Sequence, residues 1–112
     1  MYCFKKLKQN SDFRRIYGRG MSFVDSAFVV YALKNRSGDI RLGLSVSKKL
    51  GGAVMRNRAK RVLTAAFREC APNIKSGYDF VLVARSRIFG VKSTGIATKL
   101  YEFLQKADLL KE

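Results

Sequence analysis

Apolar and polar residues alternate most clearly over residues 40–47. The even-numbered positions are Ile40, Leu42, Leu44 and Val46, and the positions between them hold an arginine, a glycine and two serines. Successive side chains of a strand point to opposite faces of a sheet, so this segment predicts a strand with one core face and one small polar face. The polar face leaves room for a ligand, but the pattern is equally typical of a face that only meets water.

The neighbouring segments supply the expected partners of this strand. Residues 24–33 are rich in Val, Phe and Tyr and favour extended chain, and the turn-forming run Asn35–Asp39 separates them from residue 40. We therefore predict a hairpin formed by 24–33 and 40–47. Residues 78–84 are almost continuously apolar, which is typical of a central strand covered on both faces.

Two short segments show the apolar spacing of helices. The first begins at the capping positions 10–11, ends at the glycines of 18–20, and carries Phe13, Ile16 and Tyr17 at i, i+3 and i+4. The last begins at the capping positions 93–94 and has one apolar face, made of Ile96, Leu100, Phe103, Leu104 and Ala107.

A longer helix is predicted from Ala53 to about Cys70, with a stop signal at Pro72. Advancing each residue by about 100° separates the side chains into two stripes. The apolar stripe contains Met55, Ala59, Val62, Leu63, Ala66 and Cys70. The adjacent polar stripe is mostly basic and contains Arg56, Asn57, Lys60, Arg61, Thr64 and Arg68.

The basic stripe lacks the acidic neighbours that an ordinary solvated helix face has. Between Asp39 and Glu69 lie eight basic residues and no acidic one. Like charges four residues apart, as at Arg56 and Lys60, repel by a few tenths of a kcal/mol. A phosphate backbone would compensate for this repulsion, so we interpret the stripe as a nucleic-acid contact rather than a solvated face.

The total charge supports this interpretation. The 112 residues include 23 Lys and Arg and 8 Asp and Glu, which gives a formal charge of +15. Such a chain is expected to bind a polyanion, either nucleic acid or an anionic membrane surface. The longest apolar run, Ala27–Leu33, is far shorter than the roughly 20 residues that cross a bilayer. Because no signal peptide is recognisable either, we expect a cytoplasmic protein that does not bind membranes.

The sequence gives little support for a catalytic site or a metal site formed by side chains. The chain has no histidine, the residue that most often moves protons in a protein ribonuclease. The eight acidic residues are scattered, and four of them are expected on exposed helix faces or strand ends: Glu69, Asp79, Glu102 and Asp108. Cys3 and Cys70 lack metal-ligand spacing and are expected to be reduced thiols. We find no domain boundary, and expect residues 1–112 to form a single RNA-binding domain.

One long signature resembles a known family, the bacterial ribonuclease P protein subunit. It comprises Gly43–Lys49, Gly51, Ala53–Arg58, Lys60–Arg61 and Phe67–Arg68. Similarity extends to Asp12–Phe13, Tyr17 and Gly20, the strand Phe28–Tyr31, the strand ending at Ala84–Arg85, and the final helix. The resemblance implies a subunit that binds a catalytic RNA and the 5′ leader of precursor tRNA, and so assists endonucleolytic 5′ maturation. It further implies that the RNA performs the chemistry with Mg²⁺, that the protein has no catalytic or metal-binding residues, and that no other protein is required.

The resemblance also assigns roles to residues. The RNA-subunit contact is implied for Arg56, Asn57, Lys60, Arg61 and Arg68. A cleft for the single-stranded leader is implied for Phe13, Tyr17, Tyr31, Ser45, Ser47, Lys48 and Lys49. Spacing alone favours the core for Tyr31 and leaves Phe13 and Tyr17 undecided between core and cleft. Gly52 and Thr64 depart from the family pattern, where Asn and Arg are usual, so we expect slightly weaker or more adaptable contact at that end of the helix.

The fold that the resemblance implies is an α/β (α+β) two-layer sandwich. Its mixed four-stranded sheet has the element order αβββαβα and a left-handed β-α-β crossover, contrary to the usual right-handed rule. Three rival functions are a ribosomal protein or RNA chaperone, a protein nuclease acting alone, and a DNA-binding domain. The last lacks a tight helix-turn-helix, because a strand precedes the basic helix.

Overall fold

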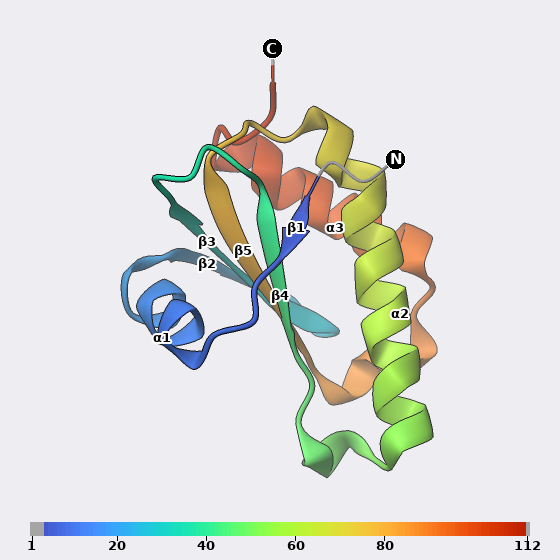
Figure 1. Cartoon of the computed structure of the whole chain (residues 1–112). Helices are drawn as coiled ribbons and strands as arrows, with labels where there is room; N and C mark the ends of the chain where they lie inside the picture. Colours follow the sequence, from blue (N-terminus) through green and yellow to red (C-terminus); the bar gives the residue numbers. More distant parts are fainter. Residues whose placement is uncertain (1–3, 112) are drawn as a thin grey trace.

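The computed structural model describes residues 4–111, which form an α+β fold around a mixed sheet of five strands (Figure 1). The helices are α1 (Asn10–Arg19), α2 (Ala53–Cys70) and α3 (Ser93–Lys106). The strands are β1 (Lys5–Lys6), β2 (Met21–Val24), β3 (Phe28–Lys34), β4 (Arg41–Ser45) and β5 (Tyr78–Ala84). Short 3₁₀ turns lie at Lys48–Leu50, Ala71–Asn73 and Ser86–Gly90. Helices α2 and α3 cover one face of the sheet, and α1 crosses the other face (Figure 1).

The strand order is β1-β4-β5-β3-β2, so the predicted hairpin of 24–33 with 40–47 is wrong. Strand β5 lies between β3 and β4, antiparallel to the former and parallel to the latter. The physical reason is burial, because β5 is the most apolar segment and the centre of the sheet is the site that covers it best. Strand β3 forms its hairpin with β2 instead, through a turn in which the Asp25 carboxylate accepts a hydrogen bond from the Ala27 amide.

The sheet has five strands rather than the expected four. The additional strand, β1, contains only Lys5 and Lys6 and pairs in parallel with β4 at the edge of the sheet. Two exposed lysines carry no apolar alternation, so this strand has no signal in the sequence. Strands β4 and β5 are parallel neighbours joined through α2, which is the expected β-α-β unit, and the left-handed crossover stays a prediction.

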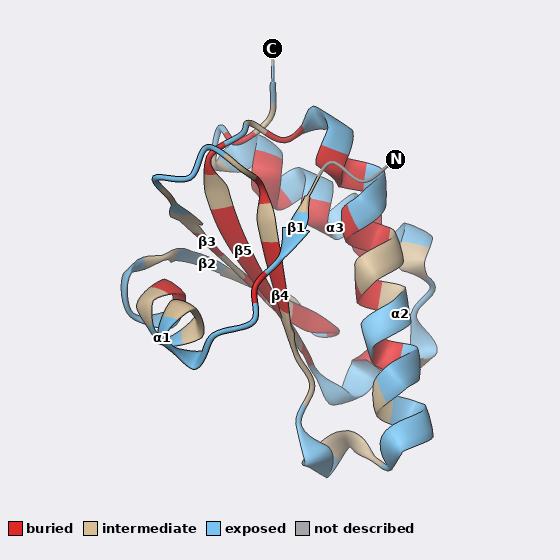
Figure 2. Cartoon of the chain, viewed as in Figure 1, coloured by how far each residue is buried: buried red, intermediate tan, exposed pale blue. Residues whose placement is uncertain are grey.

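The main core lies between the sheet and the helices α2 and α3, where the buried residues of all three meet (Figure 2). The apolar stripe predicted for α2 is buried at Ala59, Leu63, Ala66 and Cys70. Phe67 is also buried and stacks at an angle on Phe80, with ring centroids 5.3 Å apart. Met55 is an exception to the prediction, since it remains 39% exposed near the start of the helix. No helix formed by residues 4–111 has the length and apolar character needed to cross a membrane.

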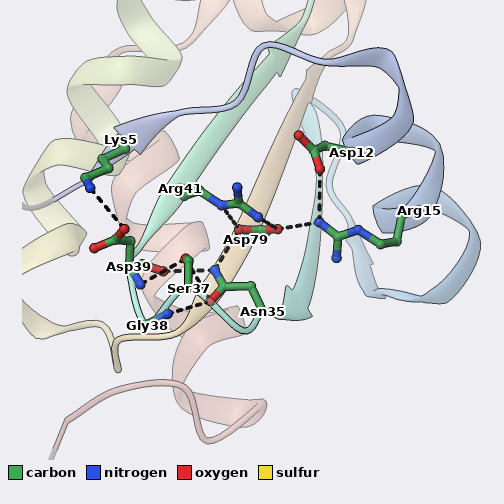
Figure 3. Close-up of polar contacts among 9 residues, drawn as sticks. All are labelled: Lys5, Asp12, Arg15, Asn35, Ser37, Gly38, Asp39, Arg41 and Asp79. Carbon is green, nitrogen blue, oxygen red and sulfur yellow. Dashed lines mark hydrogen bonds and ion pairs between the residues drawn. The ribbon is translucent and has the colours of Figure 1, made fainter.

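Asp79 does not lie at an exposed strand end as predicted, because its side chain is fully buried. Figure 3 shows the groups that surround its carboxylate. Arg41 donates to it through Nε and Nη2 at 2.7 and 2.8 Å, Arg15 through Nη2 at 2.7 Å, and Asn35 through Nδ2 at 2.7 Å. Burial alone would raise the pKa of Asp79, but these hydrogen bonds lower it below its ordinary value. We call these four residues the Asp79 cluster.

The substitution Asp79→Asn should destabilise the protein by about 3 kcal/mol in urea denaturation. This is the low end for a broken buried ion pair, because Arg15 and Arg41 keep 33% and 27% of their side chains accessible to water. The matched control is Asp39→Asn, whose pair with Lys5 lies at the surface, and it should cost less than about 1 kcal/mol. Equal effects of the two substitutions would show that the cluster does not stabilise the fold.

The Asp79 effect should also depend on pH. A carboxyl whose pKa is lower in the folded state contributes its full stabilisation of the folded protein when the pH is above the unfolded pKa of about 4. This contribution is lost as the pH falls through the folded pKa. The difference in stability between wild type and Asp79→Asn should therefore shrink below about pH 4. A difference that stays constant with pH would contradict an ionised Asp79.

Candidate RNA interface

The sheet face that carries α1 consists of three rows of side chains set by the strand register. The first row is Lys5, Arg41, Asp79 and Leu33, and the second is Gly43, Val81, Tyr31 and Ser22. The third is Ser45, Val83, Val29 and Val24. Helix α1 packs over the first two rows, whereas no residue of the third row is fully buried. We call this third row the open row.

Helix α1 approaches the sheet closely because Gly43 has no side chain. A Cβ atom at this position would lie 2.5 Å from Cζ of the Phe13 ring, which is closer than real contacts allow. Ile16 is fully buried on the same side of the helix and packs with Val81. Residue 43 is therefore a contact point for an aromatic ring, rather than part of a shallow face open to solvent as the alternation alone predicted.

The three aromatic residues predicted for the cleft lie together at the border of the open row. Phe13 and Tyr17 have ring centroids 6.3 Å apart, and Tyr17 and Tyr31 have centroids 4.9 Å apart in an edge-on arrangement. Tyr17 is 40% exposed, and Phe13 and Tyr31 are half-buried. These rings form what we call the aromatic wall, and the stacking faces that remain accessible belong mainly to Tyr17.

The polar residues predicted for the cleft lie partly in β4 and partly in the turn that follows it. Ser45 is the last residue of the strand and belongs to the open row. Ser47 lies beyond the strand, where its Oγ accepts a hydrogen bond of 3.1 Å from the Lys49 amide and caps a 3₁₀ turn. Lys48 and Lys49 are exposed in that turn. The two lysines thus follow directly after the strand that contributes Ser45.

The basic stripe of α2 is a separate surface, because α1 and α2 lie on opposite faces of the sheet (Figure 1). Its exposed members are Asn57, Lys60, Arg61 and Arg68, whereas Arg56 is half-buried. Among residues 4–111, no carboxylate forms an ion pair with Arg56, Lys60 or Arg61. At Lys60 and Arg61 the uncompensated charge that the sequence predicted is therefore present at the surface of the described residues.

A pocket of about 620 Å³ lies beside this stripe, between α2 and the N-terminal strand. Its lining includes Lys60, Arg61, Thr64 and Arg68 of α2 together with Phe4 and Lys6. Sequence reasoning missed Phe4 and Lys6, because a two-residue parallel edge strand gives no periodic pattern. The lysines at positions 5, 6 and 8 were the only available signal.

Cys70 belongs to the core rather than to a reactive site. It is buried, and its Sγ donates to the Ala97 carbonyl oxygen at 3.6 Å. Burial, with a smaller effect of the neighbouring Glu69 carboxylate, raises the pKa of the thiol to about 11. The thiol is therefore protonated at neutral pH. Cys3 lies outside the described residues.

These features define a class: a basic α+β domain with an aromatic wall on one side of its sheet and a cationic helix on the other, a combination suited to binding RNA. Comparison with known proteins identifies the family. The family model for ribonuclease P matches residues 1–108. The chain belongs to the ribonuclease P protein family.

Individual relatives agree with this assignment. The ribonuclease P protein component of Clostridioides difficile (strain 630) is 49% identical over 82 residues, which cover 72% of each chain. That of Clostridium kluyveri is 40% identical, and the aligned region covers 95% of this chain and 96% of its relative. The solved structure of the Staphylococcus aureus RNase P protein superimposes with a TM-score of 0.80 at 36% identity, covering 95% of this chain and 97% of that one. The RNase P protein from Thermotoga maritima gives a TM-score of 0.78 at 33% identity, covering 91% and 96%.

The close approach of Phe13 to the sheet can be tested with Gly43→Ala. The added methyl group must displace the ring, so the variant should lose about 1–3 kcal/mol of unfolding free energy in urea denaturation. Gly18→Ala, in α1 itself, is the control, since no atom lies within 4 Å of the added methyl group. This control should gain about 0.5–1 kcal/mol of stability. Equal stability of the two variants would show that the ring does not rest on residue 43.

Proposed function

We propose that this chain is the protein subunit of ribonuclease P, which binds the catalytic RNA subunit and the 5′ leader of precursor tRNA and assists endonucleolytic removal of the leader. Membership of the ribonuclease P family over residues 1–108 carries the proposal. The formal charge of +15 supports it, because binding to RNA releases the counterions of the phosphate backbone. Its proposed place of action is the cytoplasm.

The proposed leader surface is the aromatic wall with the adjoining open row. A single strand is held by stacking of its bases on aromatic rings and by cations that follow its backbone. Tyr17 offers an accessible ring, and Lys48 and Lys49 lie beyond the Ser45 end of the open row. The leader would enter near these lysines and pass the aromatic wall.

The proposed contact with the RNA subunit is the basic stripe of α2, namely Arg56, Asn57, Lys60, Arg61 and Arg68. Folded RNA is recognised mainly through phosphates and 2′-hydroxyl groups. Arginine presents a planar fork that suits phosphate, and an amide such as that of Asn57 can donate to and accept from a sugar or base. Gly52, just before α2, and Thr64 each stand where the family usually has a residue with greater capacity for contact, so we expect the interaction to be slightly weaker or more adaptable there.

In this proposal the protein supplies binding and orientation but no reacting group. Mg²⁺ bound by the RNA subunit supplies the activation of water and the stabilisation of charge in the transition state. The protein residues hold the leader and the RNA subunit in fixed relation on opposite faces of one sheet. We also propose that the connection from β4 through α2 to β5 is left-handed, as the resemblance to the family implies.

The deciding experiment is cleavage of a precursor tRNA at low magnesium by a bacterial catalytic RNA subunit, with and without this protein. The protein alone should be inactive, and its addition should restore cleavage by the RNA. If the protein binds RNA without changing cleavage, it is a general RNA chaperone or ribosomal protein instead. Cleavage by the protein alone would identify a protein nuclease.

The variant Tyr17→Ala tests the leader surface through the affinity of the holoenzyme for precursor and mature tRNA. It should weaken binding of precursor tRNA to the holoenzyme by about 1–3 kcal/mol, the usual contribution of one stacked base, and leave binding of mature tRNA unchanged. Tyr101→Ala is the control, because Tyr101 is a similarly exposed tyrosine on α3, which packs on the other face of the sheet. An equal effect of both variants would remove Tyr17 from the leader surface.

The basic stripe can be tested through the salt dependence of binding to the RNA subunit. Replacing Arg56 or Lys60 by alanine should lower the slope of log affinity against log salt concentration by about one in each case. Lys99→Ala, which removes an exposed charge from α3, should leave the slope nearly unchanged. An unchanged slope in either stripe variant would place that residue outside the interface.

A further inference from the structure

A second cationic pocket, of about 490 Å³, lies beside α1 and belongs to neither surface described above. We call it the flank pocket. Its cationic lining consists of Arg15, Arg19, Lys34, Arg36 and Arg41. Arg15 and Arg19 follow Phe13 and Tyr17 by two residues each, which is a rotation of about 200° around the helix. The flank pocket and the aromatic wall are therefore on opposite flanks of α1, with Ile16 facing the sheet between them.

Two of these cations are held in place before any ligand arrives. The Asp79 carboxylate accepts hydrogen bonds from Nε and Nη2 of Arg41 and from Nη2 of Arg15 (Figure 3). Each guanidinium keeps its Nη1 group outside these bonds. A fixed guanidinium with an uncommitted N–H edge binds an oxyanion at a smaller cost in side-chain entropy than a mobile one.

The charges of the pocket do not balance. Five cations line it, and the carboxylates that contact them are those of Asp12 and Asp79. Arg19, Lys34 and Arg36 form no ion pair among residues 4–111, and all three are exposed. A concave surface with an excess of one charge concentrates the field and attracts the opposite charge.

We propose that the flank pocket binds a backbone phosphate of RNA. The proposal rests on the RNA-binding function proposed above, and adds a contact outside both the leader surface and the basic stripe. The fixed arginines would contact the phosphate oxygens, while Arg19, Lys34 and Arg36 would surround it.

Two RNAs can supply this phosphate. The leader can reach the pocket by passing around the C-terminal end of α1, where Tyr17 of the aromatic wall and Arg19 of the pocket are two residues apart. Gly18 between them adds no obstacle, since no atom from outside its own stretch of the helix lies within 4 Å of the position of a Cβ atom there. The other source is a segment of the RNA subunit that extends beyond α2.

The test compares two double variants that remove the same charge. Arg19→Ala with Arg36→Ala changes the flank pocket and spares the Asp79 cluster, and Lys99→Ala with Lys106→Ala changes exposed positions on α3. Thermal unfolding of both should match wild type, because neither pair of residues is buried or ion-paired in the described structure. The salt dependence of affinity is then measured with three RNAs. The first is the RNA subunit, which binds the protein directly. The other two are precursor tRNAs that bind the holoenzyme, one with a leader that ends at the aromatic wall and one with a leader that extends well beyond it.

For the RNA that occupies the pocket, the plot of log affinity against log salt concentration should be less steep in the pocket variant than in the control, by about one unit of slope. A loss confined to the extended leader identifies the leader phosphate, and a loss for the RNA subunit identifies that partner. Equal slopes of both double variants on all three RNAs would overturn the proposal. Failure of the proposed function is distinguishable, because it would appear in the wild-type protein as an inability to bind the RNA subunit or to prefer precursor over mature tRNA.

Discussion

The carboxylate of Asp79 joins three parts of the chain that lie far apart in the sequence. Within residues 4–111, Asp79 is the only charged residue that is fully buried, and its hydrogen-bond donors come from α1, from the turn after β3, and from β4. A buried charge is stable only when its partners hold their positions. The cluster therefore ties the middle of α1 to the sheet through Arg15, and the rings of Phe13 and Tyr17 on the same helix lie beside the open row.

Features encoded by local periodicity could be predicted from the sequence. The apolar stripe of α2 is buried at Ala59 and Leu63, and the predicted core positions Ile40 and Leu42 are buried as well. The aromatic residues assigned to the cleft by family resemblance do lie together, although spacing alone left Phe13 and Tyr17 undecided. Periodicity was sufficient here because burial of one face depends on neighbours within a single element.

Features that depend on pairing between distant segments could not be predicted. The turn Asn35–Asp39 favoured a hairpin, but the insertion of β5 between β3 and β4 follows from competition for the centre of the sheet. Asp79 looks like any surface acid in the sequence, because its three partners are between 38 and 64 residues away. The contact of Phe13 with Gly43 could not be predicted either, since a glycine in a strand can mark a close approach but does not identify the group that makes it.

The chemistry of the open row has a consequence for the range of RNAs that one such protein can serve. Apart from Ser45, its side chains are Val83, Val29 and Val24, which have no hydrogen-bonding groups to match the edges of particular bases. Aromatic rings can stack on any base, because every base has a flat face. A leader held on this surface, as proposed, would be recognised as a single strand, and its base sequence would matter little. One small protein could then act on many transcripts whose leaders share no common sequence.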